Sequence, residues 1–281
     1  MASRFPESRG ARVMADSGAD WTPGIRPIMP NRITFINHAT VLIQFGQKAI
    51  LTDPVYSLSV SYFLPRLKRP GIPFDDLPAI DLVTISHNHY DHLNFRTLRR
   101  LRRQHQPAIV VSRGDARYAR RLGFDRIHEL QWWEEAELDG MKITSVPAAH
   151  FTGRTPWSRN RSAAGGFVFQ ADGKAVYFAG DTASGDFLED LASRFSLNVA
   201  LLPIGAYKPH DWFKDIHLNP LTAIDAFQRC NAQYLIPIHW GTFKISDEPM
   251  AEPPKLLLEE ARRAGIEARV RILDNGEGFD L

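Results

Sequence analysis

Short apolar runs, closed by glycine, proline or polar residues, alternate along the chain with stretches of helical periodicity from Arg32 onward. The runs are rich in β-branched residues, which favours strands over helices for segments of this length. We predict strands at residues 33–36, 40–45, 48–52, 81–86, 108–111, 142–146, 166–170, 174–179, 199–203, 234–237 and 268–273.

Helical patterns follow several of these strands, and their ends carry the expected signals. Gly123 and Gly265 stand where two of the helices should stop, and Asn219-Pro220 combines an N-cap residue with proline at the first helical position. We predict helices at residues 95–104, 115–122, 187–195 and 254–264, with another beginning at Asn219.

The alternation of strands and helices, interrupted by hairpins, predicts an α/β fold with mixed sheets. No internal repeat and no low-complexity linker divides the chain. We therefore expect a single domain over residues 31–281, preceded by a loosely ordered arm at residues 1–30.

Composition narrows the class of protein. The hydrophobic share of 44% and charged share of 23% are ordinary for a globular domain. The formal net charge of +2 does not favour nucleic acid, and Cys230, the single cysteine, excludes both an internal disulfide and an all-thiolate metal site. The arginines around residues 96–103 are interpreted as the solvated face of an amphipathic helix.

The sequence also bears on location. The first 30 residues lack the apolar core of a secretory signal, and no run reaches the roughly 20 apolar residues of a membrane span. We expect a cytoplasmic protein with no transmembrane segment. Tyr62, Phe63 and Leu64, followed by Arg66, Lys68 and Arg69, are compatible with peripheral contact with a membrane, and equally with a packed loop.

The segment Ser86-His87-Asn88-His89-Tyr90-Asp91-His92 carries the strongest chemical signal. It lies directly between a predicted strand and a predicted helix, where α/β proteins build their sites. Three imidazoles and a carboxylate at this density predict metal ligands. His87 and His89 project to the same side of an extended chain and can share one ion, while Asp91 and His92 can reach a second.

Ligand-type residues follow three further predicted strands, namely His150, Asp181 and His239. Each alone would be compatible with a surface polar residue, but their joint occurrence at strand ends favours a metal site. Imidazole and carboxylate without thiolate suit zinc, with manganese, iron or nickel as alternatives. Two such ions lower the pKa of a bridging water and stabilise a leaving oxygen, which is the chemistry of hydrolysis.

The His-x-His-x-Asp-His motif, together with the later ligands, resembles the metallo-β-lactamase superfamily over nearly the whole chain from Arg32. Longer blocks are similar to the branch of N-acylphosphatidylethanolamine-hydrolysing phospholipase D and, less completely, to the L-ascorbate-6-phosphate lactonase branch. These blocks include Leu51-Thr52-Asp53-Pro54, Trp132-Trp133-Glu134-Glu135, Pro203-Ile204-Gly205-Ala206-Tyr207 and Ile238-His239-Trp240-Gly241-Thr242-Phe243.

The resemblance implies a four-layer αβ/βα sandwich that binds two Zn²⁺ ions per chain. It assigns His87, His89 and His150 to one ion, and Asp91, His92 and His239 to the other, with Asp181 between them. It also implies that His217 handles substrate or protons, so that Asp91 and His217 are the candidate catalytic residues.

Other residues are candidates for supporting roles. His38 and Asp53 are expected to orient the ligands from behind, although Asp53-Pro54 is also typical of a turn. The loop after His150 supplies cations suited to an anionic group, and candidate substrate-binding residues are Arg154, Trp157 and Tyr207.

The predicted activity is phosphodiester hydrolysis of a phospholipid-like molecule through a hydroxide that bridges the two ions. The alternative is the opening of a lactone ring on a small phosphorylated or acylated compound, because the same hydroxide attacks phosphorus or carbonyl carbon. A nuclease and a di-iron redox protein are weaker alternatives. The expected partner is a small molecule or a phospholipid, and a homodimer is one candidate assembly.

Overall fold

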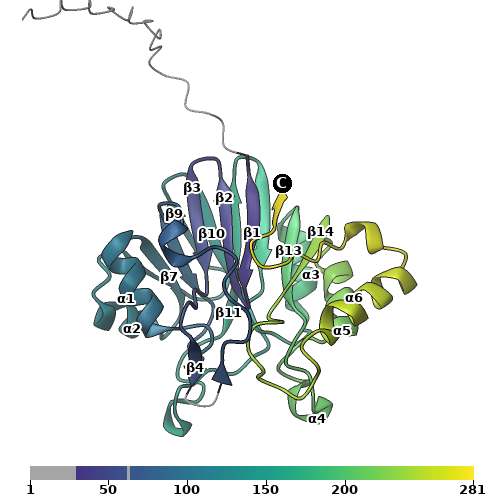
Figure 1. Cartoon of the computed structure of the whole chain (residues 1–281). Coiled ribbons are helices and arrows are strands. Elements are labelled where there is room, and N and C mark those ends of the chain that lie inside the picture. Colours follow the sequence, from purple (N-terminus) through teal and green to yellow (C-terminus); the bar gives the residue numbers. More distant parts are fainter. Residues whose placement is uncertain (1–29, 62–63) are drawn as a thin grey trace, which may run out of the picture.

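The computed structural model describes residues 30–61 and 64–281, and Figure 1 shows their arrangement as two β-sheets packed face to face with helices on both outer sides. The predicted N-terminal arm lies outside the described residues, apart from Pro30, and so do Tyr62 and Phe63.

The first sheet has seven strands in the order β15-β1-β2-β3-β6-β7-β8. Its first strands form an antiparallel meander, and β3, β6, β7 and β8 then run parallel to one another. The strands are β1 (Arg32–Asn37), β2 (Thr40–Phe45), β3 (Lys48–Thr52), β6 (Leu82–Ile85), β7 (Ala108–Ser112), β8 (Ile127–Leu130) and β15 (Gly278–Asp280).

The second sheet has six strands in the order β14-β13-β12-β11-β10-β9. Strands β9, β10, β11 and β12 pair antiparallel in chain order, and β12, β13 and β14 are parallel. The strands are β9 (Glu135–Leu138), β10 (Met141–Pro147), β11 (Gly165–Ala171), β12 (Lys174–Phe178), β13 (Val199–Pro203) and β14 (Tyr234–Ile238). A small separate hairpin pairs β4 (Ser59–Ser61) with β5 (Leu64–Pro65).

Helices α1 (Phe95–Gln104) and α2 (Ala116–Leu122) cover the outer face of the first sheet, and α3 (Phe187–Arg194), α5 (Pro220–Arg229) and α6 (Glu252–Arg263) cover that of the second. The short α4 (His210–Phe213) buries none of its residues and lies below the sheets in Figure 1. The 3-10 turns are η1 (Phe74–Asp76), η2 (Pro156–Ser158) and η3 (Glu267–Arg269). Leu98 and Leu101 of α1 pack on the first sheet, whereas Leu188 of α3 and Phe227 of α5 pack on the second.

Alternation along the strands explains the layers. In β2, Val41 and Ile43 face the second sheet, and Leu42 between them packs toward α1. The core between the sheets joins these side chains to large aromatics from the second sheet, such as Phe167 and Phe178. Both faces of the central strands are buried, so these strands appear in the sequence as continuous apolar runs.

The predicted α/β fold with mixed sheets and four αβ/βα layers is confirmed, and most predicted elements agree with the structure to within a residue or two. The predicted strand at residues 268–273 is wrong. Val270 forms an isolated bridge to Leu235, and Arg271 N donates to Leu235 O, but no longer pairing develops. The chain is crossing to the other sheet there, where β15 pairs with β1.

Candidate metal centre

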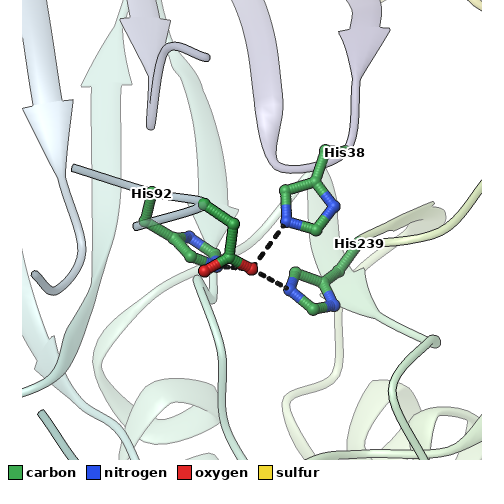
Figure 2. Close-up of side chains that lie close together, drawn as sticks. His38, His92 and His239 are labelled. Atoms are coloured by element: carbon green, nitrogen blue, oxygen red, sulfur yellow. Dashed lines mark hydrogen bonds and ion pairs between the residues drawn. The ribbon is translucent and has the colours of Figure 1, made fainter. Parts of the chain in front are cut away.

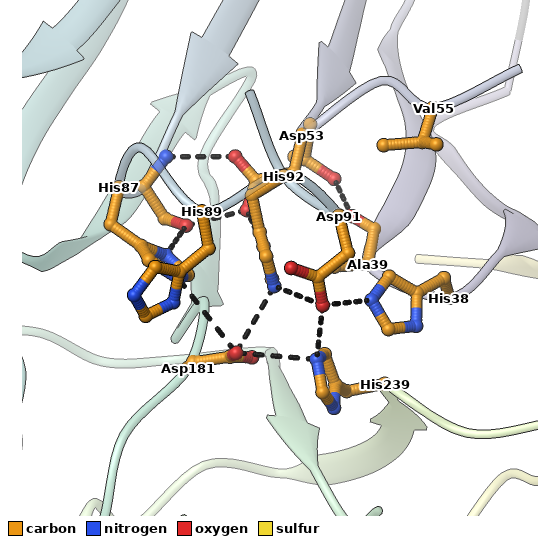
Figure 3. A network of polar contacts seen from close by, with 12 residues as sticks. His38, Ala39, Asp53, Val55, His87, His89, Asp91, His92, Asp181 and His239 are labelled. Atoms are coloured by element: carbon orange, nitrogen blue, oxygen red, sulfur yellow. Dashed lines mark hydrogen bonds and ion pairs between the residues drawn. The ribbon is translucent and has the colours of Figure 1, made fainter. Parts of the chain in front are cut away.

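The predicted ligands converge because each follows the end of a strand at the same edge of the two sheets. The loop after β6 brings His87, His89, Asp91 and His92, and the segments after β10, β12 and β14 bring His150, Asp181 and His239. Figure 3 shows most of these side chains pointing toward one another from different elements.

Three imidazoles form one group. His87 Nε2 lies 2.9 Å from His89 Nδ1, and His150 Nε2 lies 3.2 Å from the same atom. Nitrogen ligands about 2.0–2.1 Å from a tetrahedral zinc ion lie roughly 3.3 Å from one another. The spacing of the three nitrogens therefore fits one shared ion.

Asp91, His92 and His239 form the second group. Asp91 Oδ2 lies 3.5 Å from His92 Nε2 and 3.4 Å from His239 Nε2. His38 Nε2 lies 3.1 Å from the same carboxylate oxygen. Figure 2 shows the imidazoles of His38, His92 and His239 gathered around a carboxylate, and Figure 3 labels Asp91 among the same imidazoles.

Asp181 lies between the two groups. Its Oδ2 atom is 3.0 Å from His92 Nε2 and 3.2 Å from His239 Nε2 on one side. On the other side it is 3.8 Å from His87 Nε2 and 3.9 Å from His150 Nε2. A carboxylate in this position could contact an ion held by either group.

Buried atoms without hydrogen bonds show that the donor set fits metal. Within the described part of the chain, these atoms include His92 Nε2, His239 Nε2 and Asp181 Oδ1. Unsatisfied buried polar atoms are rare in native proteins, and these three belong to residues of one cluster. Cations in this cluster would satisfy the nitrogens that face the carboxylates.

A second layer orients the ligands, and Asp53 is its centre. His92 Nδ1 donates to Asp53 Oδ2 at 2.6 Å. Ser86 Oγ donates to the same oxygen at 2.5 Å and accepts from His87 Nδ1 at 2.9 Å. One buried carboxylate thus holds a ligand of each group with its Nε2 atom free for metal. His150 Nδ1 donates to Ile216 O at 2.7 Å and is held in the same way.

The charges of this cluster are strongly coupled. Burial acts to lower the pKa of His92 and His239, but the Asp181 and Asp91 carboxylates outweigh it, raising the pKa of His92 well above its usual value and that of His239 to about 9. Burial lowers the pKa of His89 to about 4 and that of His38 to about 3. Without metal, His92 and His239 therefore bind protons, because their positive charges are stabilised by the carboxylates of Asp91 and Asp181.

The backbone at the site is strained in several places. His38, Asp53 and His239 have φ values of +49°, +32° and +60°, in the left-handed region that such residues seldom adopt. Outliers of this kind persist where the surrounding structure fixes them, and they gather at functional sites. Each turns the chain sharply just after a strand, which aims its side chain into the cluster.

The other predicted site residues lie at different distances from the cluster. His217 is buried, its ring is 4.9 Å from that of His150, and it groups with His150 and Asp181 as a possible ligand set. Trp157 is exposed, and the buried Tyr207 donates its hydroxyl to Glu252 at 2.6 Å. Arg154 donates to backbone carbonyls of the His87–Leu93 segment. Roles of these residues in substrate binding or catalysis stay predictions.

The sequence did not indicate a buried polar cluster behind the metal loop. Asn88 Nδ2 donates to Asp115 Oδ1 at 2.8 Å and to Ser162 Oγ at 2.6 Å. Burial raises the pKa of Asp115 to about 6, against the opposing effect of the bond from Asn88. No pattern in the sequence links positions so far apart.

The sequence of this chain is similar to a known protein family and to several known proteins. A family model described as a beta-lactamase superfamily domain matches residues 48–240. An uncharacterized protein of Mycobacterium tuberculosis is 36% identical over 239 residues, which cover 82% of this chain and 63% of that protein. A metal-dependent hydrolase of Pelotomaculum thermopropionicum is 32% identical over 89% of this chain and its own whole length.

A mitochondrial N-acyl-phosphatidylethanolamine-hydrolyzing phospholipase D of Saccharomyces cerevisiae is 31% identical over 78% of this chain and 49% of its own length. The chain thus spans less than two thirds of the mycobacterial and yeast relatives.

Two solved structures share the fold. A possible metal-dependent hydrolase of Veillonella parvula superposes with a TM-score of 0.73 at 21% identity, over 90% of this chain and all of that one. A metallo-beta-lactamase fold protein of Bacillus subtilis superposes with a TM-score of 0.63 at 17% identity, over the same shares.

Proposed function

Because the chain belongs to the metallo-β-lactamase superfamily, we propose that it is a metal-dependent hydrolase with two metal ions, preferably zinc, that cleaves phosphodiesters of the phospholipid type. The observation that carries the proposal is the position of Asp181 Oδ2 within 4 Å of imidazoles from both ligand groups. This arrangement supports a pair of ions rather than a single structural one.

Two ions, when bound, lower the pKa of bound water and stabilise the oxygen of the leaving group. His87, His89 and His150 would hold one, Asp91, His92 and His239 the other, and Asp181 both. Asp53 and Ser86 keep the imidazoles of His92 and His87 in the tautomer that leaves Nε2 available. His217, packed against His150 with Nδ1 unpartnered among the described residues, is the candidate group to move a proton at this edge.

Lipid-like substrates are supported by the relatives and by the surroundings of the site. The yeast relative is named as a phospholipase D that hydrolyses N-acyl-phosphatidylethanolamine. Leu58, Trp157 and Trp212 are 79%, 80% and 77% exposed. Each lies close in the chain to a site residue or to a partner of the metal loop. Leu58 follows Ser57, which accepts from Asn94 Nδ2 at the end of that loop, Trp157 lies seven residues after His150, and Trp212 in α4 lies five residues before His217.

These apolar side chains suit shallow contact with lipid. None of the helices in residues 30–61 and 64–281 combines the length and apolar character that a membrane span requires. The proposal therefore places the chain at a lipid surface by peripheral contact.

The test compares kcat/KM on a bis-aryl phosphodiester, an N-acylated phospholipid in mixed micelles and a simple lactone, all with zinc-loaded protein. We expect the two phosphodiesters to be hydrolysed faster than the lactone. A lactone preference above about tenfold, equivalent to about 1.4 kcal/mol in transition-state binding, would replace the phosphodiesterase assignment with a lactonase.

A further inference from the structure

The loop between β6 and α1 carries His89, Asp91 and His92, so its shape sets the position of ligands in both groups. Its own backbone supplies one turn, in which His92 N and Leu93 N donate to His89 O at 3.2 and 2.9 Å. Asn94 then caps α1 by accepting from Thr97 N. The ends of the turn are held by a side chain from elsewhere in the chain.

Arg154 provides that side chain. Its Nη1 atom donates to Asn88 O at 2.9 Å and to Leu93 O at 2.8 Å. One carbonyl precedes the three ligands of the turn and the other follows them. A single amino group therefore ties the entry and the exit of the ligand-bearing turn together. Both hydrogens of Nη1 are used in doing so.

Two aromatic rings fix the guanidinium in this position. Its central carbon lies 4.0 Å from the centroid of the Tyr90 ring and 4.6 Å from that of Phe95. Tyr90 Oη donates in turn to Arg154 O at 2.8 Å. Cation–π contacts are stronger where solvent is partly excluded, and hydrogen bonds from a charged donor are stronger than those from a neutral one.

The same segment holds the loop at a second point. Gly153 N donates to Asn88 Oδ1 at 2.7 Å, so consecutive residues, Gly153 and Arg154, bind the side chain and the carbonyl of Asn88. The segment begins just after His150. It therefore connects the His150 ligand to the turn that carries the other ligands.

We infer that Arg154 is a positioning residue that pre-forms the ligand-bearing turn for metal, rather than a cation that meets the substrate. The inference rests on the proposed metal-dependent function. A turn already closed by Arg154 loses less conformational freedom when metal binds, and the metal affinity rises accordingly. Arginine suits this role because its planar group stacks on rings while it donates to two carbonyls.

The test measures Zn²⁺ affinity by competition with a chromophoric chelator, in the full chain and without substrate. Arg154→Ala should weaken binding by about 10–100-fold, the range found when a group behind the metal ligands is lost. Arg161→Ala is the matched control, because Arg161 is an exposed arginine of the same loop. That control should bind Zn²⁺ like the wild type.

Two further measurements separate positioning from general damage. Free guanidinium at millimolar concentration should restore part of the lost affinity to Arg154→Ala, and Arg154→Lys should fall between that variant and wild type. Circular dichroism without metal should show both variants folded. If Arg154→Ala does not fold, Arg154→Lys carries the test, with weakened Zn²⁺ binding as the expected result.

Wild-type Zn²⁺ affinity in Arg154→Ala, with KM raised only for anionic substrates, would overturn the inference and return Arg154 to substrate binding. Failure of the wild-type protein to bind Zn²⁺ would instead refute the proposed function. The two failures are therefore distinguishable in the same experiment.

Discussion

Asp53 and Asp181 are both buried carboxylates of the site, but they contact different parts of it. Asp181 faces imidazoles of both ligand groups, whereas Asp53 accepts from the far nitrogen of His92. Asp181→Ala should therefore remove a shared ligand, and Asp53→Ala should weaken metal binding by about 10–100-fold. Metal content after dialysis, measured beside kcat/KM, tests this order. Asp181→Ala should lose more metal and more activity than Asp53→Ala, and equal losses or a greater loss in Asp53→Ala would contradict these roles.

The buried carboxyl of Asp115 should make the stability of the fold depend on pH. Its folded pKa of about 6 lies above the unfolded value of 3.8, so its contribution to stability is full below about pH 4 and is lost as pH rises through about 6. Asp115→Asn keeps an oxygen for Asn88 Nδ2 and cannot ionise. From about pH 4 to about pH 7, the wild type should lose about 3 kcal/mol relative to the variant.

Urea unfolding of both proteins in chelator, over this pH range, measures the difference. A difference in unfolding free energy that does not change with pH would mean that Asp115 is ionised as readily in the folded chain as in the unfolded one.

Among the elements, the turn after β12 depends on Gly180. Its φ is +62°, and a Cβ there would lie 2.5 Å from Ser86 Cβ. In Gly180→Ala, the added Cβ should push Ser86 away from Asp181, the residue that follows position 180. We expect weaker metal binding and a loss of stability of about 2 kcal/mol or more.

Gly173→Ala is the control for this variant. Gly173 has a φ of +69° with nothing within 4 Å of an added Cβ, so the substitution carries conformational strain without the collision. It should cost about 1–2 kcal/mol and leave metal affinity unchanged. If both variants bind metal equally well, contact with Ser86 does not position the site.

Most elements could be predicted because local pattern and tertiary burial agree. Continuous apolar runs mark strands buried on both faces, and Asn219-Pro220 opens α5 as predicted, with Asn219 Oδ1 accepting from Thr222 N. Segment 268–273 also contains β-branched residues, Val270 and Ile272. Whether it pairs as a strand depends on the path that the following segment takes to the other sheet. That information lies in the topology rather than in the local sequence.

In the candidate site too, some residues could be predicted from the sequence and others could not. Ligand types at strand ends were visible in the sequence because their chemistry is unusual and their spacing is short. Arg154, Ser86 and the Asn88–Asp115 contact were not assigned these roles, because hydrogen bonds to backbone or across distant segments leave no periodic trace. The sequence therefore predicted Asp53 and His38 behind the ligands, whereas the contacts of Ser86 and Arg154 came from the structure.

For the molecule as a whole, metal binding should be coupled to protons. In the metal-free chain, His92 has a pKa well above its usual value and His239 one of about 9, so both are protonated near neutral pH. Ligation requires neutral imidazole, so binding of two ions should release about two protons per chain from these imidazoles near pH 7.5, in addition to any proton given up by metal-bound water. Calorimetric titration with Zn²⁺ in buffers of different ionisation enthalpy measures this number.

The raised pKa of His239 also predicts how the stability of the metal-free protein changes with pH. His239 has a folded pKa of about 9, above the unfolded value of 6.5, so its contribution is full below about pH 6.5 and is lost as pH rises through about 9. His239→Ala should flatten this part of the pH profile. Absence of proton release on Zn²⁺ binding would show that the imidazoles are neutral before the metal arrives.

The claim that seven side chains from four strand ends hold two ions is tested most directly by metal analysis of the purified chain, combined with turnover before and after chelation. We expect close to two ions per chain, by analogy with two-metal hydrolytic sites, loss of phosphodiester turnover on their removal, and recovery when Zn²⁺ is restored. A metal-free chain that retains full turnover would show that hydrolysis does not depend on metal.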